Sequence, residues 1–327
     1  MLSHDVADNG VLDRLLAGVS SNHQLIHLLV PLARAYVRYA PFSTGKISFW
    51  AETVNPYLAW KHYRFAARTV FGSTIAGNTR EILQQYVYYF GVWEPNLTHW
   101  LPQRLRAGDT FIDVGANIGY FSLLASKLVG PSGRVVSIEA SPMTFLDLQY
   151  NLELNRARNV RAVNMAVADR AGVVNLFQGP QTNVGLTTVI EEEALKEGCN
   201  FECEIETAPL SGILEPEEIR LARIIKIDVE GAEWDVVVGM TEMLNCCRKD
   251  LEIVIEVGPE RLARQNKRPE DLLRVFATAG FNAYRLENDY SPVSYLSRQI
   301  AKRPERLREP VECETDLVFS RQDADRL

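Results

Sequence analysis

The chain has 327 residues, of which 46% are hydrophobic and 24% are charged. This is enough for one large domain with a sizeable core and an appendage. The net charge of −7 argues against a broad nucleic-acid footprint, because such footprints are basic. The five cysteines lack metal-ligand spacing, and no apolar run of membrane-spanning length or leader pattern is present. We therefore expect a cytoplasmic protein with reduced thiols and no nucleic-acid partner.

Residues 1–100 are predicted to form a cap that serves substrate binding or dimerisation. A short helix is expected at Val11–Ala17 and a longer one at Leu25–Tyr39, where apolar residues follow helical spacing around Pro31. The longer helix is interpreted as one docked on the core or on a partner subunit, which makes this region a candidate homodimer surface. A membrane-surface helix or a lid is the alternative. The aromatic segment Ile47–Gly91 predicts short strands or a hairpin whose rings pack a small core or line a substrate pocket.

Residues 101–327 are predicted to form the main domain, and its first unit is the stretch from Thr110 to Val129. Thr110–Val114 reads as a buried strand, and Phe121–Val129 reads as a helix. Gly115, Asn117 and Gly119 stand in the tight turn between them. The G-x-x-x-G spacing lacks the third glycine of a dinucleotide site. Asp113, just before the turn, suits an ammonium group better than a phosphate. The combination favours S-adenosylmethionine as the ligand.

The next strand, Arg134–Glu139, ends in a second candidate ligand. Glu139 follows Gly119 by 20 residues, the distance at which such folds place an acid on the ribose hydroxyls. Ser141 and Pro142 then predict a helix N-cap and its first residue. The third strand, Val160–Val167, is expected to end beside the adenine ring, with Met165–Ala168 as its floor.

Two later strands carry further acids. In Arg223–Glu230, Ile225, Ile227 and Val229 alternate with Lys226, Asp228 and Glu230. A charge inside a central strand is costly unless paired, and we expect a structural ion pair for Lys226 but a site role for Asp228. Leu251–Val257 follows, with Glu256 predicted to lie next to Asp228. Further strands are expected at Phe281–Leu286 and Glu312–Ser320. The basic residues between them predict a solvated helix: Arg298, Lys302, Arg303, Arg306 and Arg308.

Five segments together resemble the FkbM family of class I S-adenosylmethionine-dependent methyltransferases. They are D-V-G-A-N-I-G-Y-F-S-L-L-A, V-V-S-I-E-A-S-P, N-L-E-L-N, N-V-R-A-V-N-M-A-V and K-I-D-V-E-G-A-E, which begin at Asp113, Val135, Asn151, Asn159 and Lys226. The resemblance covers about Leu101–Val257. It implies an α/β fold, with a Rossmann-like, seven-stranded, mostly parallel sheet and helices on both faces. Ala140 stands where the family usually has Pro, and Ser211 stands where it usually has an acid.

The resemblance also implies the chemistry, which is methyl transfer to a hydroxyl of a small molecule or glycan, with S-adenosylhomocysteine as product. Gly91–Pro95 resembles a family element in the segment that folds over the donor, where Glu94 is expected to be either a donor contact or a surface acid before a turn. The predicted donor site is Glu94, Asp113, Gly115, Asn117, Gly119, Glu139, Ala140, Ser141, Ala166 and Asp228. The predicted catalytic groups are Asp228, Glu256 and Glu230, and no metal is expected. A nicotinamide-dependent oxidoreductase and a non-catalytic S-adenosylmethionine-binding protein remain alternatives.

Overall fold

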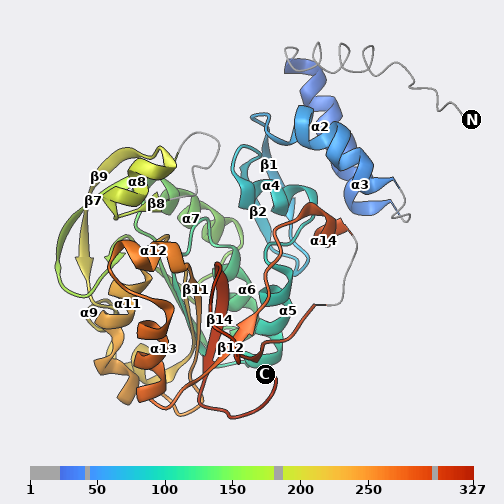
Figure 1. Cartoon of the computed structure of the whole chain (residues 1–327). Helices are drawn as coiled ribbons and strands as arrows, with labels where there is room; N and C mark the ends of the chain where they lie inside the picture. The colour runs from blue at the N-terminus through green and yellow to red at the C-terminus, as the bar shows by residue number, and fades with distance from the viewer. Residues whose placement is uncertain (1–22, 41–44, 180–186, 297–300) are drawn as a thin grey trace, which may run out of the picture.

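A computed structural model describes residues 23–40, 45–179, 187–296 and 301–327 (Figure 1). The helix predicted at Val11–Ala17 lies outside these ranges. Within the described residues, no helix is long and apolar enough to cross a membrane.

The cap combines helices with a two-stranded hairpin. Its elements are α2 (His23–Tyr39), α3 (Lys46–Phe49), the π-helix η1 (Trp50–Ala59), β1 (Arg64–Arg68), β2 (Thr74–Asn78), α4 (Ile82–Tyr89) and α5 (Pro95–Arg104). The predicted hairpin is β1 and β2, which pair antiparallel from Arg64–Asn78 to Arg68–Thr74. The α2 helix runs through Pro31 rather than starting there. The predicted division near residue 100 stays a prediction, and α5, which spans it, packs on α6 (Tyr120–Val129).

The large sheet has the order β13-β12-β14-β11-β10-β3-β4-β5. Its strands are β3 (Thr110–Val114), β4 (Arg134–Ile138), β5 (Val160–Val163), β10 (Ala222–Ile227), β11 (Glu252–Val257), β12 (Asn282–Leu286), β13 (Glu305–Arg306) and β14 (Thr315–Ser320). The strands from β11 to β5 are parallel, whereas β14 is antiparallel to its neighbours β11 and β12. This confirms the predicted fold class.

The sheet differs from the prediction at both edges. An eighth strand, β13, pairs antiparallel with β12, so the helix expected for the basic run is wrong for the described residues from Lys302 to Arg308. The third strand stops at Val163, and Ala166–Val167 leaves the sheet as β6. β6 pairs with β9 (Asn200–Ala208), and β7 (Gly172–Gln178) and β8 (Thr187–Thr188) complete a separate sheet of order β6-β9-β7-β8.

Helices cover both faces of the large sheet because alternate strand residues point to opposite sides. Phe111, Val135 and Ile224 pack with α5, α6 and α7 (Pro142–Leu154). Their neighbours Ile112, Val136 and Ile225 pack with the helices of the other face. These include α9 (Leu210–Ile213), α11 (Glu233–Met240), η2 (Glu242–Asn245), α12 (Pro259–Arg264) and α13 (Pro269–Thr278). The short helices α8 (Glu191–Glu197) and α10 (Pro216–Leu221) lie in the connections.

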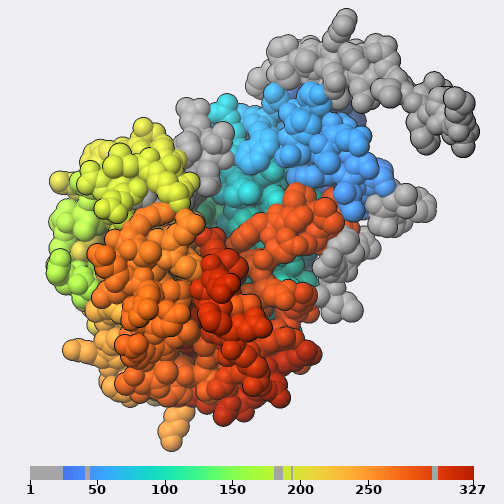
Figure 2. Space-filling model, in the orientation of Figure 1, coloured from blue at the N-terminus to red at the C-terminus, as the bar shows by residue number. Residues whose placement is uncertain are grey.

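The C-terminal part of the chain lies against the cap. In Figure 2 the orange and red segment around α14 (Pro292–Leu296) lies beside the blue cap elements. The Tyr86 hydroxyl donates to the carbonyl of Tyr290 at 2.7 Å, and Tyr295 packs edge-on against the Tyr86 ring. Residues 287–296 therefore connect the cap to the sheet on one side of the cavity described next.

Candidate functional site

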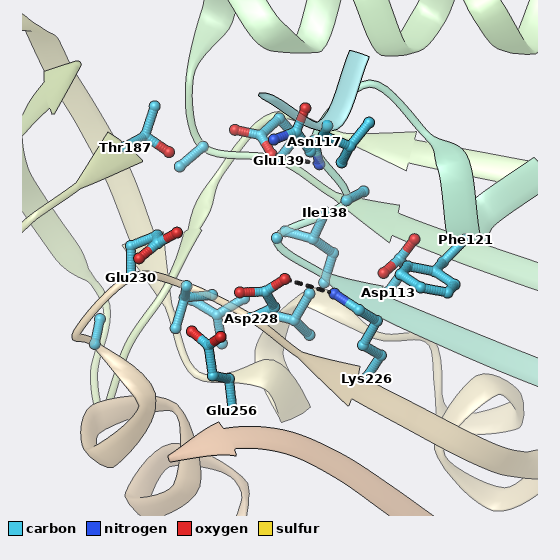
Figure 3. A pocket seen from close by; sticks show the side chains of 18 of the residues that line it. Asp113, Asn117, Phe121, Ile138, Glu139, Thr187, Lys226, Asp228, Glu230 and Glu256 are labelled. Atoms are coloured by element: carbon cyan, nitrogen blue, oxygen red, sulfur yellow. Dashed lines mark hydrogen bonds and ion pairs between the residues drawn. The ribbon is translucent and has the colours of Figure 1, made fainter. Parts of the chain in front are cut away.

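A cavity of about 310 Å³ lies at the carboxyl edge of the large sheet, where β3, β4, β10 and β11 end (Figure 3). Ligands of open α/β sheets bind at this edge. Most of the predicted site residues line this cavity: Glu94, Asp113, Gly115, Asn117, Glu139, Ala140, Ala166, Asp228, Glu230 and Glu256. The structure thus brings together acids that are up to 162 positions apart in sequence, from Glu94 to Glu256.

The glycine turn packs directly beneath the chain that leaves β10. The backbone N–H groups of Gly115 and Ala116 donate to the carbonyl of Ile138 at 2.9 and 3.0 Å. Gly115 has a φ of +78°, and a Cβ atom there would lie 1.8 Å from the carbonyl oxygen of Asp228. Only glycine fits this position. The turn therefore fixes the distance between the end of β3 and Asp228.

Glu139 is held by backbone groups on either side of its carboxylate. Asn117 N–H donates to Oε2 at 2.8 Å, and Ser141 N–H donates to Oε1 at 2.9 Å. Burial raises the pKa of Glu139 to about 7, and these two hydrogen bonds oppose the shift. A carboxylate has about four lone-pair positions, so two remain for ligand hydroxyls. The group is positioned in advance to accept such hydrogen bonds.

Asp113 is buried in β3 and lines the inner end of the cavity. Its Oδ2 accepts from Ser122 Oγ at 2.6 Å, and Ser122 accepts in turn from Ser137 Oγ at 2.7 Å. Among the described residues, Oδ1 has no hydrogen-bond partner. Burial raises the pKa of Asp113 to about 6, while the Lys226 ammonium opposes the rise. An unpaired buried acceptor is costly, which indicates that a ligand donor belongs here.

Asp228 follows β10 and is paired with Lys226, as the dashed line in Figure 3 marks. Lys226 Nζ donates to Asp228 Oδ2 at 2.8 Å. The sequence-based expectation that Asp228 stays outside this structural ion pair is therefore wrong. The reason is the end of β10 at Ile227, which lets Asp228 turn back over Lys226. The lysine is buried and Asp228 is about one-third exposed, so the carboxylate still faces the cavity.

Glu256 and Glu230 share one guanidinium. Arg261 of α12 contacts Glu256 Oε2 at 2.7 Å, Glu230 Oε2 at 2.6 Å and Glu314 Oε2 at 3.4 Å. Burial raises the pKa of Glu230 to about 8, and the positive charge of Arg261 opposes this shift. Burial, with repulsion from Asp228, also raises the pKa of Glu256. Arg261 therefore holds both carboxyls at the cavity.

Glu94 lies where the cap meets the sheet. It is 5% exposed and has a φ of +39°, which is uncommon for a residue with a side chain. The Tyr290 hydroxyl donates to its Oε1 at 3.5 Å, and the Tyr290 ring lies 5.1 Å from that of Trp93. Burial, followed by repulsion from Asp316, raises the pKa of Glu94. Such a group gains from a bound cation.

The far end of the cavity is mainly apolar. Its lining there comes from β6, β7, β8 and the adjoining loops: Met165, Ala166, Val167, Leu176, Thr187 and Val189. Residues 165–167 are part of the segment predicted as the floor for an adenine ring. An aromatic base needs such a surface on its faces. Thr187 and Thr188 of this lining region form β8.

Gly119 and Ser141 do not line the cavity, and the structure gives each another role. A Cβ atom at Gly119 would lie 2.7 Å from Leu148 Cδ1 of α7, so this glycine permits close helix packing. The Ser141 hydroxyl accepts from Thr144 N–H at 3.2 Å as the N-cap of α7 and donates to Glu202 at 2.8 Å. Only its backbone N–H reaches the site, through Glu139.

Three cavity residues had no signal in the sequence. Arg261, Tyr290 and Glu314 all line the cavity. Arg261 sits on a short helix with other charged residues, and Tyr290 and Glu314 belong to irregular segments. No spacing rule marks such positions, because their place at the site depends on how the C-terminal third folds back over the sheet.

The sequence matches a known protein family. The Methyltransferase FkbM domain matches residues 113–283. The chain is 27% identical over 213 residues to Methyltransferase sdnD of Sordaria araneosa, with 58% of this chain and 79% of that protein covered. It is 31% identical to 31-O-demethyl-FK506 methyltransferase FkbM of Streptomyces tacrolimicus, covering 42% and 62%. Hexuronic acid methyltransferase AglP of Haloferax volcanii is 24% identical, covering 60% and 78%.

Solved structures give a weaker likeness. A methyltransferase FkbM from Methylobacillus flagellatus aligns with a TM-score of 0.37 and 15% identity, covering 73% of this chain and 54% of that one. A SAM-dependent O-methyltransferase from Thermotoga maritima aligns with a TM-score of 0.40 and 13% identity, covering 80% and 78%. The domain match spans more than half of the sequence, and the chain belongs to the FkbM methyltransferase family.

Proposed function

We propose that the protein transfers a methyl group from S-adenosylmethionine to a hydroxyl of a small molecule or glycan. The observation that carries this proposal is the Glu139 carboxylate, which Asn117 and Ser141 fix at the cavity edge with acceptor positions to spare. Ribose hydroxyls are the donors that such a group suits. The family to which the chain belongs supports methyl transfer over the oxidoreductase alternative.

The charges of the cavity also support a cationic donor molecule. Its lining holds more carboxylates than cations, and the cations Lys226 and Arg261 are already paired with Asp228, Glu230 and Glu256. A pyrophosphate would meet repulsion here. We assign the ammonium of the amino-acid tail to Asp113 and Glu94, whose buried carboxyls form no ion pair with another of the described residues. The apolar lining around Ala166 is assigned to the adenine.

When bound, S-adenosylmethionine supplies an electrophilic methyl group, and the chain's own residues orient the acceptor and take its proton. Asp228 is the first candidate for the base, because no hydrogen bond to its Oδ1 is found among the described residues and its side chain reaches the cavity. Positioning and exclusion of water contribute most to such a displacement. Choice of a hydroxyl acceptor rests on the O-methyltransferases among similar proteins.

The test is release of S-adenosylhomocysteine by the full chain when hydroxylated small molecules and sugars are added. We expect turnover that depends on the acceptor and is lost on heat denaturation. Binding of S-adenosylmethionine without turnover on any acceptor fraction would instead favour the non-catalytic alternative.

A chelator gives a separate prediction. We expect full activity after treatment with EDTA, because Asp228, Glu230 and Glu256 are paired with Lys226 and Arg261 rather than free to bind a metal ion. Activity is measured before and after treatment, with calcium-saturated EDTA as the control. Loss of activity that magnesium restores would contradict this and would make Asp228 and Glu256 metal ligands.

A further inference from the structure

The cap helix α2 is apolar on two sides. Val30, Ala33 and Val37 are buried against the rest of the cap. A second row of large side chains is exposed instead, and we call it the outer stripe: Leu25 (37% exposed), Leu28 (59%), Leu32 (57%), Tyr36 (40%) and Tyr39 (63%). At 3.6 residues per turn, these five positions fall within an arc of about 80°. An apolar row of this kind normally marks an interface.

The outer stripe carries no charge. The helix has two charged residues, Arg34 and Arg38, and both guanidinium groups lie over the ring of Tyr39 at one end of the stripe, 6.0 and 5.5 Å from its centroid. Arg34 Nε donates to the carbonyl of Tyr88 at 2.8 Å, and Arg38 Nη2 donates to the carbonyl of Arg68 at 2.5 Å. A helix on a lipid surface normally has a rim of free basic residues. Because both arginines of α2 are engaged within the cap, this arrangement argues against the membrane-surface alternative.

The spacing of the stripe is symmetric about its centre. Leu28 and Tyr36 lie four residues on either side of Leu32, and Leu25 and Tyr39 lie seven residues on either side. Two such helices that cross antiparallel at Leu32 place each leucine opposite a tyrosine. Successive residues of the stripe are three or four positions apart, which is the spacing of side chains that interdigitate between packed helices. A self-complementary patch is what a two-fold dimer interface requires.

We propose that the outer stripe is a homodimer interface, in which the α2 helices of two copies pack antiparallel about a two-fold axis near Leu32. Leu28 then packs on the partner subunit's Tyr36, and Leu25 on the partner subunit's Tyr39. Figure 1 shows α2 at the end of the cap remote from the large sheet. The inner face of α2 packs on α4 and η1, and the first turn of α4 lines the cavity. Pairing through the outer stripe therefore leaves the cavity open in both copies.

Sedimentation equilibrium of the full chain tests the proposal. We expect the wild type to have twice the chain mass of 36.9 kDa and Leu32→Glu to be monomeric, with a dissociation constant raised by roughly 100-fold or more, because two carboxylates would meet at the axis. Leu195→Glu is the matched control, because Leu195 is 77% exposed on α8 and far from α2 in the chain. Circular dichroism checks that each variant is folded.

Three results would overturn the proposal. One is a wild-type monomer at up to roughly 0.1 mM, a concentration that detects even weak pairs. Another is a Leu32→Glu variant that stays as dimeric as Leu195→Glu. The third is a monomer that floats with anionic lipid vesicles through the same stripe. Binding of S-adenosylmethionine is measured on the same samples, and its presence or absence leaves the dimer result unchanged.

Discussion

At the residue scale, the ion pair between Lys226 and Asp228 gives Asp228 two tasks. Its Oδ2 neutralises a buried ammonium, and its remaining oxygen faces the cavity. Burial alone lowers the pKa of Lys226, but the carboxylates of Asp228, Glu94 and Asp113 raise it above its ordinary value. The lysine therefore stays charged, and the second oxygen of Asp228 is left for its proposed role as a base or a donor ligand.

The two tasks predict separable effects of Asp228→Asn. We expect the saturated turnover rate to fall by about 10²–10⁴-fold with little change in S-adenosylmethionine affinity, as for loss of a general base. The free energy of unfolding should also fall, by about 3–5 kcal/mol, because Lys226 loses its partner. Steady-state kinetics and urea denaturation measure the two quantities.

The double variant Lys226→Met with Asp228→Asn separates the roles. It should regain most of the stability, because no buried ammonium is left unpaired, while turnover stays low. Recovery of turnover together with stability would show that Asp228 serves structure alone. Unchanged turnover in the single variant would remove Asp228 as the base and leave Glu256 and Glu230, both paired with Arg261, as candidates.

At the element scale, the strand–turn–helix unit from Thr110 to Val129 could be predicted closely, because its apolar run and glycines are local signals. The observed strand is Thr110–Val114 and the helix begins at Tyr120. The position of Glu139 at the cavity could also be predicted, from its distance in sequence to the glycine turn. The split of the third strand into β5 and β6 was not, because it depends on pairing with β9, far along the chain. Arg261 and Tyr290 reach the cavity for similarly non-local reasons.

The glycine turn yields a prediction of its own. Gly115→Ala should destabilise the protein by about 3 kcal/mol or more, because the added Cβ meets the Asp228 carbonyl in addition to the strain of positive φ. Gly198→Ala is the matched control. Its φ is +67° with no atom within 4 Å of the added Cβ, so its cost should be about 1 kcal/mol. Chemical denaturation measures both, and equal costs would mean that the turn is not packed on Asp228.

At the scale of the whole molecule, the site concentrates buried acids in the free protein. Burial raises the pKa of Asp113 to about 6, of Glu81, Glu139 and Asp316 to about 7, and of Glu230 to about 8. The unfolded chain has ordinary pKa values near 4 for these groups. At pH values between the unfolded and the folded pKa of these acids, the folded state binds more protons than the unfolded state. The free energy of unfolding must therefore fall as pH rises through this range.

We therefore expect the midpoint temperature of thermal unfolding of the free protein to decrease as the pH is raised from about 5 to about 8. Glu139→Gln should flatten part of this slope, since an uncharged group at that position releases no proton. Differential scanning calorimetry in buffers of matched ionic strength measures the effect. A midpoint temperature that rises steadily from pH 5 to pH 8 would contradict this, because it would mean that ionising these acids in the folded protein does not lower the free energy of unfolding.

The central claim is that the cavity binds S-adenosylmethionine through Glu139, and isothermal titration calorimetry tests it most directly. The wild type should bind S-adenosylmethionine and not NAD. Glu139→Ala should weaken binding by about 1–3 kcal/mol, the cost of unpaired ribose hydroxyls. Glu202→Gln is the control, because Glu202 lies beside Ser141 but outside the cavity lining, and its affinity should match the wild type. Equal affinity in the Glu139 variant, or preferential binding of NAD, would contradict the account.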